Sequence, residues 1–173
     1  QIVMIKKILI GILMTFAASQ FFKPQKNTSV ENTNGIHTKY SVPENVNHLL
    51  EVACNDCHSN KTAYPWYATI QPVAWWLNMH VVDGKKHLSF STFTRLPIAV
   101  QNHKFEEVIE MVEKKEMPLA SYTYLGLHKE ADLSDEQRKT ITDWAKAQMD
   151  SLKVSYPPDS LILKRKAPPA TTN

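Results

Sequence analysis

Cysteine and glycine are scarce in this chain of 173 residues. It contains only two cysteines, so no second pair can complete a four-cysteine zinc site. A disulfide between these two, which are separated by two residues, would close a very small loop and stabilise little. Four glycines against ten prolines disfavour tight hairpins. Because no segment alternates apolar and polar residues either, the sequence predicts an all-α fold.

A strong net charge is also missing. The formal net charge is +3 at pH 7, and no basic stripe with interleaved aromatic residues occurs. We therefore expect no nucleic acid partner. Hydrophobic residues make up 43% of the chain, which is enough for one packed domain with appended segments.

The first 22 residues predict export from the cytoplasm. A basic pair at residues 6–7 precedes an apolar run at residues 8–22, which is shorter than the roughly 20 residues that a spanning helix prefers. This pattern is typical of a signal peptide, and Ala17 and Ser19 are small residues suited to cleavage. An uncleaved N-terminal membrane anchor is the alternative. Both interpretations predict a periplasmic location, or one on the outer face of the cytoplasmic membrane of a bacterium.

The rest of the chain divides into three parts. A polar linker is expected at residues 23–42, a folded domain at residues 43–153, and an extended C-terminal arm at residues 154–173. Apolar spacing and terminal signals predict four helices in the folded domain. The first should run from Pro43 to the cysteines; the others should cover residues 73–84, 103–115 and 135–152. Ser134 and Gln137 form a capping box at the start of the last helix.

The stretch "CNDCHSN" at residues 54–60 indicates the chemistry of the chain. A c-type haem is attached by thioether bonds from two cysteines, and two intervening residues let one turn of chain span the attachment points. A histidine directly after the second cysteine is then aimed at the iron. Cys54, Cys57 and His58 supply these three parts. They predict one covalently bound haem c, with His58 as the proximal iron ligand.

Two other interpretations of this motif are a thiol-redox pair and half of a zinc site. A thioredoxin-like pair needs a preceding strand and a surrounding sheet, whereas here a predicted helix precedes the cysteines. A zinc site would need a second pair of ligands, and no further cysteine exists. Export favours haem as well, because thioether attachment occurs outside the cytoplasm.

The sequence offers two candidates for the distal iron ligand, on the side of the haem opposite His58. Met117 is the predicted distal ligand because it lies at the end of a predicted helix and Pro118 stops that helix. A thioether ligand stabilises ferrous iron and raises the reduction potential. His80 is the alternative: as a ligand it would give a bis-histidine haem of lower potential, and without binding it could serve as a distal acid or base. A structural histidine and a gap-filling methionine are the plainer interpretations.

Aromatic residues gather in the stretch that follows the motif. Residues 63–80, "AYPWYATIQPVAWWLNMH", hold three of the four tryptophans. Trp66 and Trp75 are therefore predicted to line the haem pocket, with indole N–H groups available to the haem propionates. Packing in an ordinary core is the alternative for both.

Several stretches together resemble the haem-binding domain family of bacterial envelope monohaem c-type cytochromes. They are "CNDCHSN", "YPWY", "PVAWWL" with His80, "LSFS", "EMP" with Tyr122, and "LSDEQRKTITDW". The resemblance extends over roughly residues 20–152. It implies an exported, membrane-tethered, single-haem domain in which Cys54, Cys57 and His58 carry the cofactor. The chain departs from the family pattern at Lys115, where a glycine is expected before "EMP", and at Gly126, which is inserted near His128.

The expected function is one-electron transfer between redox partner proteins of the cell envelope, on a small cytochrome c-like helical domain. No catalytic residue is expected for this function. The alternative is a haem enzyme, peroxidase-like, or a gas or redox sensor. It would need a labile sixth ligand and His80 as the distal residue.

Overall fold

The computed structural model describes residues 1–164, and every regular element in this range is helical. The α-helices are α1 (Ile2–Ser19), α2 (Glu44–Ala53), α3 (Asn55–His58), α4 (Val73–His87), α5 (Ile98–Glu113), α6 (Ala120–Thr123) and α7 (Asp135–Ser155). The 3₁₀ turns are η1 (Ile36–Thr38), η2 (Trp66–Thr69), η3 (Phe93–Arg95), η4 (Tyr124–Gly126), η5 (Lys129–Ala131) and η6 (Pro158–Ser160). The all-α prediction is confirmed.

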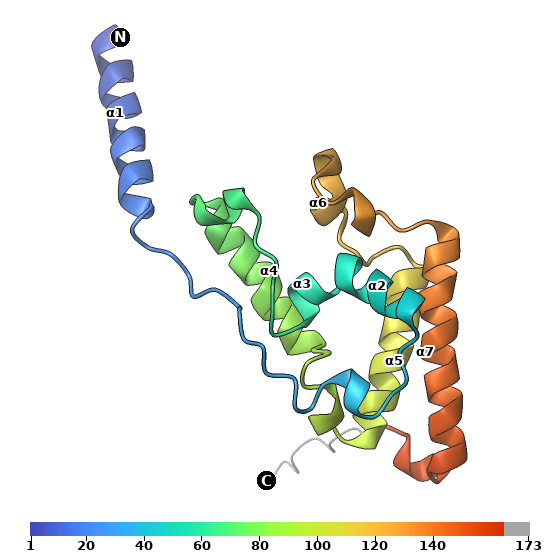
Figure 1. Ribbon diagram of the computed structural model, residues 1–173. Coiled ribbons are helices and arrows are strands. Elements are labelled where there is room, and N and C mark those ends of the chain that lie inside the picture. Colours follow the sequence, from blue (N-terminus) through green and yellow to red (C-terminus); the bar gives the residue numbers. More distant parts are fainter. Residues whose placement is uncertain (165–173) are drawn as a thin grey trace, which may run out of the picture.

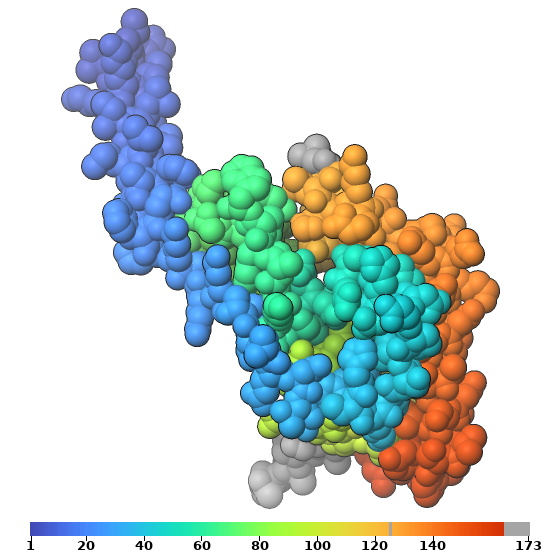
Figure 2. All heavy atoms as spheres, in the orientation of Figure 1, coloured from blue at the N-terminus to red at the C-terminus, as the bar shows by residue number. Residues whose placement is uncertain are grey.

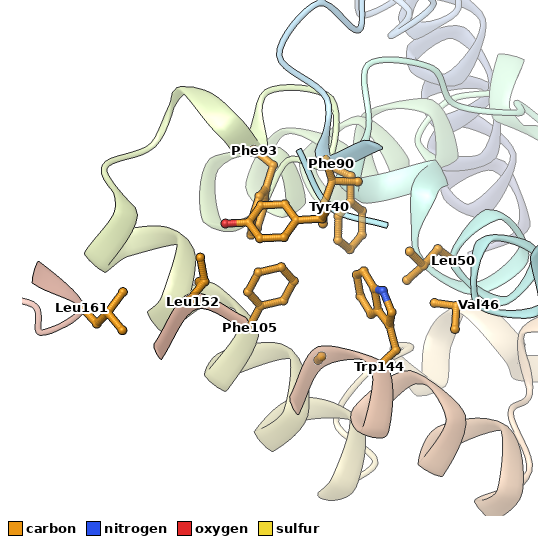
Figure 3. Packing of buried hydrophobic residues seen from close by; sticks show 11 residues of the cluster. Tyr40, Val46, Leu50, Phe90, Phe93, Phe105, Trp144, Leu152 and Leu161 are labelled. Carbon is orange, nitrogen blue, oxygen red and sulfur yellow. The ribbon is translucent and has the colours of Figure 1, made fainter. Parts of the chain in front are cut away.

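Helices α5 and α7 lie side by side and form the base of the domain, with α2 packed against them (Figure 1). The main core cluster, drawn in Figure 3, joins α2 to α7 through contacts among buried apolar side chains. Phe105 lies at its centre, with its ring edge-to-face against Tyr40 and Trp144. Helix α2, which leads into the motif, and Trp144 of α7 therefore share one buried cluster.

The capping box at the start of α7 is formed as predicted. The Ser134 hydroxyl accepts from the Gln137 backbone N–H, and the Gln137 side chain accepts from the Ser134 backbone N–H. Other helix limits differ from the expected ones. Helix α5 begins at Ile98, five residues early, because Pro97 holds the extended backbone that precedes a first turn. Helix α4 continues past Gly84 to His87.

The segments that flank the predicted domain also reach its core. Ile36 and Tyr40, from the second half of the expected linker, are buried in the main cluster. Leu161, from the expected C-terminal arm, is buried there too, and its carbonyl accepts from the Asn102 side chain. The last nine residues of that arm, 165–173, lie outside the described residues.

Helix α1 projects away from the rest of the chain (Figure 1). All of its residues except Ser19 are exposed, and its mean hydropathy of 1.9 makes it the one helix in the described range that is long and apolar enough to cross a membrane. A signal sequence has the same properties. Its end is fastened to the domain, since the Gln71 backbone N–H donates to Gln20 Oε1 at 3.0 Å.

Candidate functional site

The haem motif occupies a single helical turn. Helix α2 ends at Ala53, Cys54 leaves the helical conformation at φ −128° and ψ −43°, and α3 carries the rest of the motif. The backbone N–H groups of Cys57 and His58 both donate to the Cys54 carbonyl, at 3.2 and 2.9 Å. The helix predicted to run through Cys57 is therefore broken at Cys54. This break places the two thiols and the imidazole on a separate short turn.

The segment at residues 88–91, which follows α4, fixes this turn from one side. His58 Nδ1 lies 3.0 Å from the Leu88 carbonyl, and the His58 carbonyl accepts from the Phe90 backbone N–H at 2.7 Å. The Ser91 hydroxyl accepts from the Asn60 backbone N–H at 3.0 Å. Because a carbonyl oxygen can only accept, Nδ1 carries the proton and Nε2 keeps its lone pair. This is the arrangement by which a backbone carbonyl orients a metal-binding histidine.

Burial sets the protonation states of the motif. It lowers the pKa of His58, against the opposing effect of the backbone groups of Leu88 and Gly84, and so favours the neutral imidazole. Burial also raises the pKa of Cys54 to about 12 and that of Cys57 to about 11. Thiol-redox sites lower the pKa of the attacking cysteine instead. The environment of these thiols therefore disfavours the thiol-redox interpretation.

Gly84 lets α4 lie directly against the motif. A Cβ atom at this position would lie 2.7 Å from the Cys57 carbonyl oxygen and 3.0 Å from Cys57 Cβ. A glycine inside a helix costs about 1 kcal/mol relative to alanine, so its presence in mid-helix calls for a packing reason. Here the reason is the approach of the α3 backbone. From the sequence we expected α4 to end at Gly84, where a glycine is common. The packing role of this glycine inside the helix was therefore not predicted.

A polar cluster fixes the motif from the other side. The Tyr122 hydroxyl donates to Asp56 Oδ2 at 2.7 Å, and Asp56 lies between the two cysteines. The ring of Tyr122 stacks on His128 with centroids 4.0 Å apart, and His128 Nε2 lies 3.2 Å from the Tyr67 hydroxyl. Burial and the Asp56 carboxylate together raise the pKa of Tyr122, so its hydroxyl remains a donor. Sequence reasoning assigned no role to Asp56, which looks like a spacer between the cysteines.

The two candidate distal ligands lie on different segments. Met117 is partly buried in the loop after α5; its backbone N–H donates to the Met111 carbonyl, and its carbonyl accepts from Arg138 at 2.6 Å. His80 lies on α4, one turn before Gly84, with Nδ1 2.9 Å from the Trp76 carbonyl and its ring against that of Trp76. Among the described residues, neither side chain forms a hydrogen bond with His58.

The predicted pocket tryptophans lie on the outside of the described chain. Trp66, on η2, is 78% exposed and packs edge-to-face on Tyr67. Trp75, on α4, is 44% exposed. Their assignment to the haem pocket therefore remains a prediction, and neither contributes to the core clusters.

Two cavities among the described residues are lined by other parts of the chain than the motif. The larger one, about 490 Å³, is an open groove between α5 and α7 lined mainly by lysines and glutamates. Among residues 1–164, no three His, Cys, Asp or Glu side chains come together as a metal ion would require. The donors present instead fit a haem: one oriented, neutral imidazole with a free Nε2, and two thiols on the same turn.

Comparison with known proteins supports this fit. The sequence pattern of the family described as "Haem-binding domain" matches residues 14–147 of the chain. No curated protein and no solved structure matches it significantly. The family match covers most of the chain, including the motif turn, α4, the Met117 loop and the start of α7. The chain therefore belongs to the haem-binding domain family and is a haem protein.

Proposed function

We propose that this haem protein is a monohaem c-type cytochrome that carries single electrons between redox partner proteins in the bacterial cell envelope. The observation that carries the proposal is the motif turn. Cys54 and Cys57 lie one turn apart, and His58 follows with Nδ1 held by the Leu88 carbonyl. One group that uses two thiols and one oriented imidazole at this spacing is haem c.

The two cysteines supply the covalent attachment. Each thiol would add its S–H across one vinyl group of a bound porphyrin, so that sulfur would bond one vinyl carbon and the hydrogen would go to the other. Atoms and electrons balance without an oxidant. Iron, when bound, supplies the one-electron change between its ferric and ferrous forms. His58 holds it through Nε2, and the Leu88 carbonyl fixes the ring orientation.

Met117 is the distal ligand that we propose. Two hydrogen bonds fix its backbone, one from its own N–H to the Met111 carbonyl and one from Arg138 to its carbonyl. Five residues later, the Tyr122–Asp56 hydrogen bond ties the same segment to the motif. A ligand on this segment therefore keeps its distance from His58 when the iron changes charge. Small rearrangement of this kind favours fast electron transfer.

Export and membrane attachment form part of the proposal. Helix α1 is apolar and exposed, and Lys6 and Lys7 at its start have the charge expected on the cytoplasmic side. These features support a domain outside the cytoplasm, held by α1 as an uncleaved anchor. Separation of membrane and soluble fractions, followed by N-terminal sequencing of the chain, tests whether α1 is retained.

The attachment is tested by the spectrum of the denatured protein. Covalent haem c keeps its colour and its pyridine haemochrome spectrum after acid–acetone extraction, whereas free haem is removed. We expect the wild-type chain to keep the spectrum and the Cys54→Ala, Cys57→Ala double variant to lose it. Extraction of all haem from the wild-type chain would overturn covalent attachment.

Carbon monoxide separates an electron carrier from the alternative haem enzyme or sensor. A reduced carrier with two fixed axial ligands should bind CO weakly and slowly. Rapid, tight binding of CO would favour a haem with a labile sixth site and His80 as the distal residue. His80 Nδ1 lies against the Trp76 carbonyl of its own helix, which leaves Nε2 as the ring nitrogen for that role. Spectra of Met117→Ala and His80→Ala then assign the ligand. If Met117→Ala leaves the spectra and the potential unchanged, the assignment of Met117 is wrong.

A further inference from the structure

Most exposed large apolar side chains of the folded domain lie on three segments. Helices α2 and α5 and the body of α7 present none. The segments are η2 with the residue after it, α4, and the η4 region, and their exposed residues are Trp66, Ile70, Trp75, Trp76, Met79, Val82, Tyr124 and Leu127. Val30, Val154, Ile162 and Leu163 are exposed elsewhere. Exposed apolar residues that lie together in this way mark a surface that another protein or a membrane covers.

Two of these segments adjoin each other at the end toward which α1 projects. Tyr67, next to Trp66, is within hydrogen-bond distance of His128, next to Leu127. Tyr124, on the same short segment, is 68% exposed. Figure 1 shows η2, the start of α4 and α6 on the side of the domain to which α1 extends, and Figure 2 shows the corresponding segments at the surface there.

The end of α1 is clasped to this same face. Gln71, which lies in the sequence between Ile70 and the start of α4, is fully buried. Its backbone N–H donates to Gln20 Oε1 at 3.0 Å. Its side-chain amide donates to the Phe22 carbonyl at 2.6 Å. The last residues of the apolar helix are therefore tied to the chain beside Ile70 and Trp75. Phe21 and Phe22, both exposed, extend the apolar surface from α1 onto the domain.

We propose that this end of the domain, formed by Phe21, Phe22, Trp66, Ile70, Trp75, Tyr124 and Leu127, rests in the interfacial region of the membrane that α1 spans. The inference depends on the proposed anchoring by α1 and adds the orientation of the domain. Lys6 and Lys7 mark the cytoplasmic end of the apolar run, so the opposite end of α1, at Ser19, lies at the outer face of the membrane. The Gln20–Gln71 clasp then sets η2 at the depth of the lipid headgroups.

The chemistry of the face suits that depth. Tryptophan and tyrosine concentrate at membrane–water interfaces because their rings are apolar and their N–H or O–H groups remain hydrated. Lys23 and Lys26, both exposed, follow the apolar helix directly and can pair with anionic headgroups. Contact with a bilayer explains both why these aromatic residues are exposed and why they lie beside the end of α1. A haem bound at the motif would not explain their position beside α1.

Nitroxide labels on the haem-loaded full chain test the orientation. Trp66→Cys and Tyr124→Cys are labelled in nanodiscs of phosphatidylethanolamine and phosphatidylglycerol, with Val154→Cys as the matched control. Val154 is an exposed apolar residue, 90% accessible, on the far end of α7. Power saturation in the ferrous state compares collisions with oxygen, which enters lipid, and with a nickel chelate, which stays in water. Haem absorption checks the folding of each variant.

We expect the oxygen-to-nickel ratio at positions 66 and 124 to be several-fold higher than at position 154. Equal ratios at all three positions would overturn the proposal. Dipolar broadening between labels would indicate that a second copy of the chain covers this face. Strong relaxation of the labels by ferric haem, together with a low oxygen-to-nickel ratio, would indicate that the face lines the haem pocket. Either result would also overturn the proposal. Label counts by mass spectrometry test the attachment separately, because each variant carries one label if Cys54 and Cys57 are thioethers and three if they are free.

Discussion

Replacing Gly84 with alanine tests how closely α4 must approach the motif. The added Cβ would lie 2.7 Å from the Cys57 carbonyl oxygen, where ordinary contact begins at 3.4 Å, so the backbones must part by about 0.7 Å. Overpacking of this kind costs about 1–3 kcal/mol. Alanine recovers about 1 kcal/mol through its helix propensity. We therefore expect a net loss of up to about 2 kcal/mol in the free energy of unfolding.

The same displacement should disturb the imidazole. Leu88, whose carbonyl holds His58 Nδ1, follows Gly84 by one turn, and its backbone N–H donates to the Gly84 carbonyl at 2.9 Å. Moving α3 away from α4 therefore weakens the bond that orients the proposed proximal ligand. A changed haem absorption spectrum should accompany the loss of stability.

Thermal unfolding followed by circular dichroism measures the effect, which should lower the midpoint by several degrees, since about 1 kcal/mol corresponds to roughly 2–4 °C at this size. Lys86→Ala is the control. It lies on the exposed side of the same helix and should stay within about 0.5 kcal/mol of wild type. If Gly84→Ala is as stable as Lys86→Ala and keeps the wild-type spectrum, the close approach of α4 does not constrain the motif.

Three further changes have defined outcomes. Tyr122→Phe should lower the free energy of unfolding by about 1–2 kcal/mol in chemical denaturation, because it removes the hydrogen bond to Asp56, while Tyr124→Phe should not. Burial raises the pKa of Tyr40 to about 12, and Tyr156 adds a smaller effect in the same direction. As the pH rises, Tyr40 therefore loses its proton in the unfolded state before it does so in the folded state. The free energy of unfolding should fall as the pH rises from 10 toward 12. Tyr40→Phe should flatten that fall, and an unchanged pH profile would contradict the assignment. Lys115→Gly should stabilise the chain by up to about 1 kcal/mol, because Lys115 has a φ of 59° and glycine adopts that conformation without strain; an equal gain in Lys115→Ala would refute this cause.

Lys115 also shows what a sequence pattern can predict. The resemblance led us to expect a glycine there, and the structure places the residue in the left-handed conformation that ends α5. The capping box at Ser134 and the buried spacing of α7 were predictable for the same reason: a local pattern determines them. The three cofactor residues of the motif could be read from the sequence, but the helix break at Cys54 that places them on a separate turn could not.

Contacts between distant segments could not be predicted in this way. Leu88 holds His58 through a backbone carbonyl, which no side-chain pattern reveals. Tyr122 reaches Asp56 across 66 residues, and Ile36 enters the core from a segment whose composition is that of a linker. The exposure of Trp66 was likewise hidden, because an aromatic residue looks the same in sequence whether it faces a core, a cofactor or a membrane.

The direction of the His58 ring bears on the distal ligand. Nδ1 points to Leu88 at the end of α4, and Nε2 lies on the far side of the five-membered ring, so the proposed iron position lies away from that end of α4. A distal ligand must approach the iron from beyond it. His80 belongs to the same helix as the proximal clamp and would have to reach around the iron from about two turns away. Met117 belongs to a separate segment, and the Tyr122–Asp56 hydrogen bond ties that segment to the motif. We therefore expect Met117→Ala to lower the reduction potential and alter the ferrous spectrum, and His80→Ala to leave both unchanged; the reverse pattern would place α4 on the distal side.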